Sequence, residues 1–339
     1  MNKRLILALF ALFLPFSPVL AAPAFQQDSR QPLVLASVHP LALMAASVVP
    51  SSQLNVLVPA GMTPHDFALR PSDIDLIQNA DIIIWSGPLA EPYLKGFASR
   101  WSDKVWLDIS TLAPNSRVTD PHWWLSPAVM KLAQAELAKH MGADSRAFAE
   151  AVDRAMADSQ QLLAPVHERG FFVFHRAYDH WVYALGLNQV GSFTLSPEQK
   201  PGMRTLQTMR EQLQRGEAVC VFSEPEFSPA LVDSVVEGLT VGRGELDPLG
   251  ANIELAPMGY PAYLRDMAQR ASLCLGGAAQ PQQPVSDATR EAAVKALQQE
   301  AAHHHDHDEH ADHDEHADND EHEHADHDGH ADESQSKTR

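Results

Sequence analysis

No apolar stretch of the 339-residue sequence is long enough to cross a membrane as a helix, which needs about 20 apolar residues. The longest such run, residues 5–16, follows Lys3 and Arg4 and precedes alanines at positions 21, 22 and 24. Basic residues before a short apolar run and small residues after it are typical of a cleavable secretory signal peptide, which we place at residues 1–24. We therefore expect the chain to be exported and its mature part to be soluble.

Cysteine is scarce, and Cys220 and Cys274 are its only occurrences. Neither lies just after the predicted cleavage site, where a lipid anchor would be attached, so we expect a periplasmic protein without an anchor. An even number of cysteines in an oxidising compartment favours a single disulfide. Zinc ligation by the two thiolates is the alternative, but the pair is 54 positions apart and lacks C-x-x-C spacing.

Basic residues are too few to form a surface for nucleic acid. The chain has 25 Lys and Arg against 44 Asp and Glu, a net charge of −19 at pH 7. Because no basic stripe is present to neutralise phosphates, we expect no nucleic acid among the partners. Residues 301–339 hold 14 of the acidic residues and two basic ones, so this tail supplies −12 and the remainder only −7.

The same tail contains 11 histidines interleaved with Asp and Glu. It has almost nothing apolar to bury, so we expect residues 300–339 to be disordered. Zinc scavenging is its favoured role, and a metal-dependent contact with a partner or a solvated spacer are the alternatives. Auxiliary, weak zinc binding is expected at His303, His304, His305, His307, His310, His313, His316, His322, His324, His327 and His330.

The rest of the chain alternates short apolar or β-branched runs with helical patterns, which is typical of α/β units around a mainly parallel sheet flanked by helices. About 275 residues favour two such lobes. Strands are predicted at residues 33–38, 54–59, 81–86, 105–108, 171–174 and 218–222. Helices are predicted at residues 41–49, 71–79, 205–215, 229–239 and 260–272, and from Ser126 as N-cap with Pro127 as first residue.

One further segment, residues 144–163, is rich in helix-forming residues and contains no glycine or proline. Its apolar positions recur near helical spacing, so we predict one long, rigid helix that joins the lobes. The predicted organisation is therefore a signal peptide, a first lobe, a linking helix, a second lobe and a tail, at residues 1–24, 30–142, 143–169, 170–299 and 300–339.

Three of the seven histidines outside the tail stand at the ends of predicted elements. His65 follows a strand, His122 precedes a helix, and His175 ends an apolar strand. Loops at the carboxyl ends of parallel strands are where open α/β sheets bind ligands, and zinc prefers tetrahedral sites of neutral imidazoles and carboxylates. We therefore predict a zinc site at these three residues, which converge if their loops face one cleft.

The fourth zinc ligand is expected to be the carboxylate of Asp247 or of Glu224, or a water molecule. Each carboxylate has the alternative role of accepting hydrogen bonds from the backbone of its own loop. Among the other histidines, His39 is a spare candidate because it follows the first strand. Two are expected on the surface and one outside the cleft, namely His140, His167 and His180.

Six sequence blocks, in this order, resemble those of a known family. They are Pro-His-Asp-Phe-Ala-Leu-Arg-Pro-Ser-Asp, Gln-Asn-Ala-Asp-Ile-Ile-Ile-Trp-Ser-Gly-Pro, Asp-Pro-His-Trp-Trp-Leu-Ser-Pro, Val-Phe-His-Arg-Ala-Tyr, Phe-Ser-Glu-Pro-Glu-Phe and Leu-Asp-Pro-Leu-Gly. Over nearly all of residues 33–275 the chain resembles the solute-binding proteins of zinc and manganese ABC importers, the cluster A-I or cluster 9 family, and most closely its zinc-specific branch. The resemblance implies two α/β lobes joined by a long rigid helix, with the metal in the cleft between them.

By this resemblance the ligands are His65, His122 and His175, with Asp247 at the position where many relatives supply a carboxylate. The manganese branch typically carries Glu where this chain has His175, and oxygen-rich ligation suits manganese, so histidine here indicates zinc. Zinc-branch relatives usually carry a histidine-rich segment between the first two ligand histidines. This chain has its tract at the C-terminus instead.

The resemblance also implies a function, that of a periplasmic, high-affinity component that captures Zn(II) and delivers it to the inner-membrane ABC permease for uptake. It places Cys220 and Cys274 where zinc-branch relatives form a disulfide. We expect a monomer without enzymatic activity, and a periplasmic metallochaperone is a further candidate partner. The alternatives are a periplasmic zinc buffer or metallochaperone and a zinc hydrolase, although the sequence has no H-E-x-x-H motif.

Overall fold

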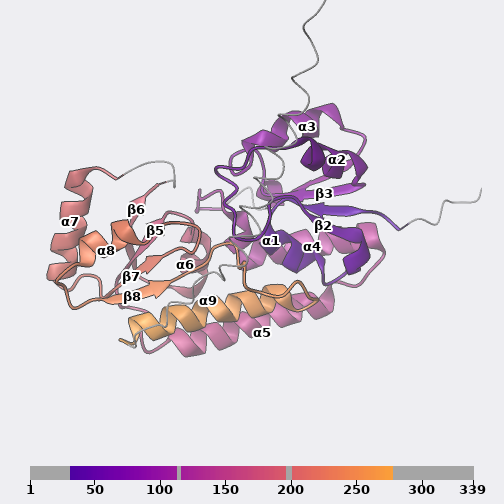
Figure 1. Cartoon of the computed structure of the whole chain (residues 1–339). Helices are drawn as coiled ribbons and strands as arrows, with labels where there is room; N and C mark the ends of the chain where they lie inside the picture. The colour runs from indigo at the N-terminus through magenta and orange to yellow at the C-terminus, as the bar shows by residue number, and fades with distance from the viewer. Residues whose placement is uncertain (1–30, 113–115, 196–200, 278–339) are drawn as a thin grey trace, which may run out of the picture. The chain divides into compact units, whose positions relative to one another are not determined.

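The computed structural model describes residues 31–112, 116–195 and 201–277 (Figure 1). The signal peptide predicted at residues 1–24 and the tail predicted at residues 300–339, with its 11 histidines, lie outside these residues. All of the described residues belong to one compact unit. None of the helices within them combines the length and the apolar character that crossing a membrane requires.

The first lobe is built on a four-stranded parallel sheet with the strand order β2-β1-β3-β4. Its strands are β1 (Val34–Ala36), β2 (Leu54–Val56), β3 (Ile82–Trp85) and β4 (Val105–Asp108). Every residue of β3 is buried, as expected for a central strand covered on both faces. Its helices are α1 (His39–Ala45), α2 (Pro71–Asn79), α3 (Lys95–Arg100) and α4 (Pro127–Met141), with short 3-10 turns at Ser51–Gln53, Pro92–Leu94, Ile109–Leu112 and Trp123–Leu125.

The second lobe repeats this topology in the order β6-β5-β7-β8, again with parallel neighbours. Its strands are β5 (Phe171–His175), β6 (Gln189–Thr194), β7 (Cys220–Ser223) and β8 (Gly242–Glu245), and its helices are α6 (Asp179–Leu185), α7 (Met203–Gln214) and α8 (Ala230–Val236). In each lobe the chain passes from the first strand to one side and then to the other. The switch points, where such sheets bind ligands, therefore lie between β1 and β3 and between β5 and β7.

Two long helices connect the lobes, and the sequence predicted only one of them in that role. The predicted linking helix is α5 (Arg146–Leu163), and it packs alongside α9 (Gly259–Leu275) (Figure 1). α9 begins against the first lobe, where a Cβ atom on Gly259 would lie 2.7 Å from a methyl carbon of Leu43 in α1. It ends at Leu275, beside the second lobe. The predicted fold of two parallel-sheet lobes is confirmed.

The predicted disulfide is also confirmed, because Cys220 in β7 is bonded to Cys274 near the end of α9, with their Cα atoms 5.9 Å apart. The alternative of zinc ligation by these thiolates is therefore wrong. The bond ties the sheet of the second lobe to the connecting helix. Both cysteines are buried in the core.

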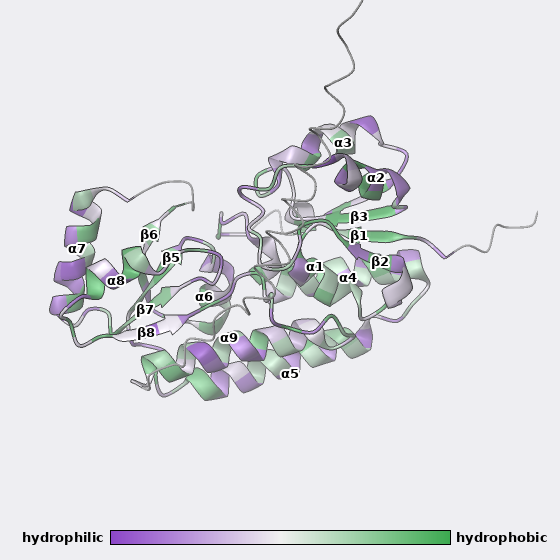
Figure 2. Ribbon diagram, viewed as in Figure 1, coloured by the Kyte–Doolittle hydropathy of each residue, from purple (hydrophilic) through white to green (hydrophobic). Residues whose placement is uncertain are grey.

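Several predicted element bounds differ from those observed. α1 begins at His39 rather than at residue 41, because Pro40 in its first turn has a φ already suited to a helix. β8 was not predicted, since its sequence is Gly-Arg-Gly-Glu. It forms through pairing with β7, and a Cβ atom on Gly244 would lie only 2.6 Å from the Phe222 ring. Figure 2 shows the contrast with β1 and β3, whose hydropathy matches their burial.

Candidate metal centre

His65, the first predicted ligand, lies in the loop that follows β2 in the first lobe. Its side chain is partly exposed, and its backbone N–H donates to Thr63 Oγ1 at 3.3 Å. Two residues further on, Phe67 is buried and its ring packs on Tyr93 with a centroid distance of 5.7 Å. This contact anchors the loop close to the histidine, so His65 is presented from a supported backbone.

His122, the second, lies just before the 3-10 turn Trp123–Leu125 and is almost completely buried. Its Nδ1 lies 2.6 Å from Asp120 Oδ1, and its backbone N–H donates to the same oxygen at 3.0 Å. The other oxygen of Asp120 accepts the N–H of Asp179 in α6 of the second lobe, at 3.1 Å. A carboxylate in this position holds the proton of a neutral imidazole on Nδ1, which leaves Nε2 free to ligate a metal.

His175, the third, is the last residue of β5 and stands at the switch point of the second lobe. Its Nδ1 lies 2.8 and 2.7 Å from the two carboxylate oxygens of Glu224, which directly follows the neighbouring strand β7. The two side chains are 3% and 1% exposed. Glu224, which the sequence offered as a ligand, therefore lies behind His175 and directs its Nε2 outward.

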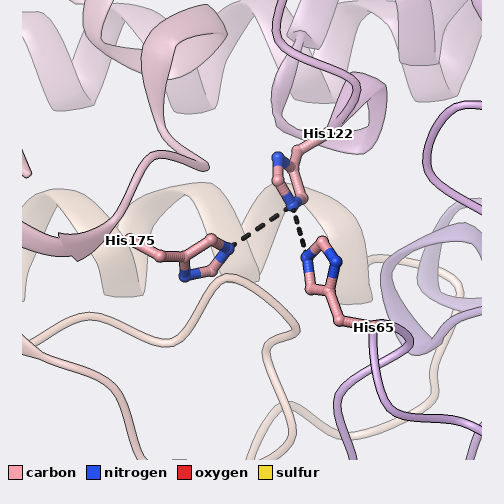
Figure 3. Close-up of side chains that lie close together, drawn as sticks. All are labelled: His65, His122 and His175. Carbon is pink, nitrogen blue, oxygen red and sulfur yellow. Dashed lines mark hydrogen bonds between the residues drawn. The ribbon is translucent and has the colours of Figure 1, made fainter. Parts of the chain in front are cut away.

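The three imidazoles converge on one point from the two lobes (Figure 3). His122 Nε2 lies 3.1 Å from His65 Nε2 and 3.4 Å from His175 Nε2. Tetrahedral ligands at Zn–N distances of about 2.0–2.1 Å are roughly 3.3 to 3.4 Å apart. When His122 and His175 are neutral and donate their Nδ1 protons to these carboxylates, each presents a lone pair at its facing Nε2 atom. Such a pair favours a cation between its members.

The cavity enclosed by these rings has a volume of about 10 Å³, the space that one water molecule or ion needs. Within the described residues, no other set of three His, Cys, Asp or Glu side chains brings its ligand atoms as close together. The remaining side chains of the wall are Thr63, Pro64, Trp124, Glu224, Glu226, Phe227, Pro248 and Leu249.

Trp124 joins the two lobes in the wall of this cavity. Its indole N–H donates to the Pro248 carbonyl of the second lobe at 2.8 Å, and its own carbonyl accepts the Tyr260 hydroxyl of α9 at 2.9 Å. Its ring stands edge-on to His122 with a centroid distance of 5.1 Å. These buried contacts hold the first-lobe histidine in register with the second lobe.

Asp247, the predicted candidate for a fourth ligand, lies outside the group of converging ligand atoms. Its Oδ1 accepts the backbone N–H groups of Leu249 and Gly250 at 2.8 and 2.9 Å, and its Oδ2 accepts that of Ala251 at 2.7 Å. Burial raises the pKa of Asp247, against the effect of these hydrogen bonds. Its hydrogen-bonding role is therefore visible, and its ligation of zinc stays a prediction.

Glu226 is the acidic residue of the cavity wall that the sequence analysis did not identify as a candidate ligand. Burial, followed by the carboxylates of Asp247 and Glu224, raises the pKa of Glu226 well above its usual range. Glu226 belongs to the motif Glu-Pro-Glu, but nothing in that motif distinguishes the second glutamate from the first. Two carboxyl groups, those of Glu224 and Glu226, thus line the cavity beside the imidazoles, and Asp247 lies close behind them.

The remaining histidines lie outside the converging group. His39 Nε2 contacts the Ile253 carbonyl at 2.9 Å, and His140 and His167 are exposed, as predicted. His180 is not among the residues that line the cavity, in agreement with the prediction, and its Nε2 contacts the Asp120 carbonyl at 2.8 Å. It therefore supports the loop that carries His122.

The sequence matches the profile of the family described as "Zinc-uptake complex component A periplasmic" over residues 34–274. The high-affinity zinc uptake system protein ZnuA of Yersinia pestis is 32% identical over 290 residues, which cover 71% of this chain and 91% of that protein. The protein of the same name from Haemophilus ducreyi is 30% identical over 288 residues, covering 71% and 93% of the two chains.

Solved structures show the same fold. A zinc-bound deletion mutant of ZnuA superposes with a TM-score of 0.62 at 22% identity, over 74% of this chain and 100% of that chain. The periplasmic zinc-binding protein TroA of Treponema pallidum superposes with a TM-score of 0.62 at 17% identity, again over 74% and 100%. The family profile spans both lobes and all three converging histidines. The chain belongs to the family of periplasmic zinc-uptake component A proteins.

Proposed function

We propose that this protein captures Zn(II) in the periplasm and delivers it to the membrane permease of a high-affinity zinc importer. The observation that carries the proposal is the convergence of three histidines, in which His122 Nε2 lies 3.1 and 3.4 Å from Nε2 of the other two and carboxylates lie behind His122 and His175. The relative from Yersinia pestis, a high-affinity zinc uptake system protein by name, supports the transport role. Export through the signal peptide at residues 1–24 is part of the proposal.

Zinc capture uses ligands from both lobes. His65 and His122 belong to the first lobe and His175 to the second, so a bound ion pins the lobes across the cavity. Because α5 and α9 both connect the lobes, they restrict a wide hinge motion between them. We therefore infer that zinc is released through movement of one loop. His65 is the partly exposed ligand, and its loop is the one we expect to withdraw first when the permease docks.

Isothermal titration of the mature chain with zinc tests the proposal. We expect one tight site, whose affinity falls by at least about tenfold in His175→Ala. His140→Ala is the matched control, since His140 is an exposed histidine of α4, and it is expected to bind tightly. Equal affinity in the wild type and in His175→Ala would overturn the assignment of the site.

Removal of the tail separates capture in the cavity from storage by the tail. A chain ending at Glu300 is expected to keep the tight site and to lose several weaker ones. Loss of all tight binding on truncation would instead make the protein a zinc buffer. Restoration of growth under zinc limitation, in a strain that lacks this binding protein but keeps the permease, by the wild type and not by His175→Ala, tests delivery to the permease.

A further inference from the structure

Three carboxyl groups lie in or next to the cavity, and two of them are already hydrogen-bonded to histidine or backbone N–H groups. Both oxygens of Glu224 face His175 Nδ1, at 2.8 and 2.7 Å. The oxygens of Asp247 accept three backbone N–H groups, at 2.7 to 2.9 Å. In contrast, both oxygens of Glu226 are buried and accept no N–H or hydroxyl group of the described residues, and the one polar side chain within hydrogen-bonding reach of Glu226 is the Asp247 carboxyl. Buried polar atoms without a donor are rare, and a bound ion is one of the arrangements that accounts for them.

We propose that Glu226 supplies the fourth ligand to the zinc ion held by the three histidines. The inference rests on the proposed function, since it concerns the same ion. Glu226 lies in the loop after β7, at the switch point of the second lobe, and its side chain lines the cavity together with His65, His122 and His175. With it, each lobe contributes two ligands to a tetrahedral site.

Charge and position both favour Glu226. Three neutral imidazoles bring no negative charge into direct contact with the zinc ion, and a carboxylate ligand offsets one of its two positive charges at contact distance. The oxygens of Glu226 lie outside the group of ligand atoms within 4.8 Å of one another, so the side chain turns toward the Nε2 atoms as zinc enters. Asp247 cannot turn in the same way without losing its charge-assisted hydrogen bonds to the loop.

A crystal structure of the zinc-loaded mature protein, phased at the zinc edge, tests the proposal directly. The expected result is an oxygen of Glu226 at about 2.0–2.2 Å from the ion, with the three Nε2 atoms completing the tetrahedron. Water or Asp247 in the fourth position, with Glu226 unmoved, would overturn it. Either of those results leaves the proposed function intact, whereas absence of zinc from the three histidines would overturn the proposed function itself.

Zinc titration of Glu226→Gln provides the second test. Glutamine keeps the size of the side chain and removes its charge, so zinc affinity is expected to fall at least about tenfold while the thermal midpoint of the zinc-free protein does not fall. Asp247→Asn is the matched comparison and is expected to bind zinc more tightly than Glu226→Gln. An affinity of Glu226→Gln within twofold of the wild type would sink the inference, and His175→Ala reports separately on the site as a whole.

Discussion

The carboxylate of Glu224 is expected to set zinc affinity without touching the ion. Both of its oxygens lie within 2.8 Å of His175 Nδ1, and the two side chains are 1% and 3% exposed, so water does not replace a lost partner readily. Loss of a carboxylate behind a metal-binding histidine weakens metal affinity about 10- to 100-fold, which corresponds to about 1.4 to 2.7 kcal/mol. The size of the effect then depends on what replaces Glu224.

Two substitutions of Glu224 are expected to lie at the two ends of this range of about 10- to 100-fold. Glu224→Gln keeps an oxygen that accepts the Nδ1 proton and loses only the charge, so we expect a loss of about tenfold. Glu224→Ala leaves Nδ1 without an acceptor, which lets the proton move to Nε2 and block the metal-binding atom. We expect a loss near 100-fold for this variant.

Competition with a fluorescent zinc chelator at pH 7.5 measures these affinities, and the ¹⁵N shifts of His175 report which ring nitrogen carries the proton. Glu150→Ala is the matched control, because Glu150 is exposed on α5 and far from any ligand in sequence. The reasoning is refuted if Glu224→Ala is folded, binds zinc within twofold of the wild type and keeps the Nδ1–H form.

Three further predictions concern stability and the tail. Burial raises the pKa of Glu91 from 4.5 to about 7, so the unfolded state loses its proton first and stability falls as the pH rises between these values. Urea unfolding should therefore show Glu91→Gln more stable than the wild type by roughly 3 kcal/mol at pH 8 and equal to it at pH 4, and parallel pH profiles would contradict this. Replacing Cys220 and Cys274 by serine removes a disulfide between residues 54 positions apart, which should lower the free energy of unfolding by about 4 kcal/mol. Denaturant titration measures this difference from the oxidised wild type. The reduced wild type is the control and should be equally destabilised. The weak zinc sites of the tail should be lost as the pH falls through about 6.5, because imidazoles bind metal only when neutral. Calorimetry at pH 7.5 and 5.5 tests this. Sites that persist at pH 5.5 would show that carboxylates bind the zinc instead.

Local patterns were sufficient for the four strands of the first sheet, for β5 and β7 of the second, and for the positions of the three histidines at element ends, but not for β6 and β8. The buried strands β3 and β5 are apolar throughout, apart from the terminal His175. Strand ends are visible in the sequence because polar residues, glycine and proline follow them, and parallel strands bring their carboxyl ends to one edge. A histidine at such an end is therefore recognisable as a candidate ligand from its position in the sequence alone.

Only the tertiary structure decided which carboxylate does what. Four acidic loop residues look alike in the sequence but have different roles in the structure. Asp120 orients His122, and Glu224 orients His175. Asp247 accepts hydrogen bonds from the backbone of its own loop, and Glu226 lines the cavity. The second connection between the lobes, α9, was equally hidden. These roles depend on contacts between residues far apart in the chain, whereas sequence periodicity reports only on near neighbours. Composition and spacing thus predicted the fold class and the three histidines that converge, and long-range packing determined which carboxylates lie behind and beside them.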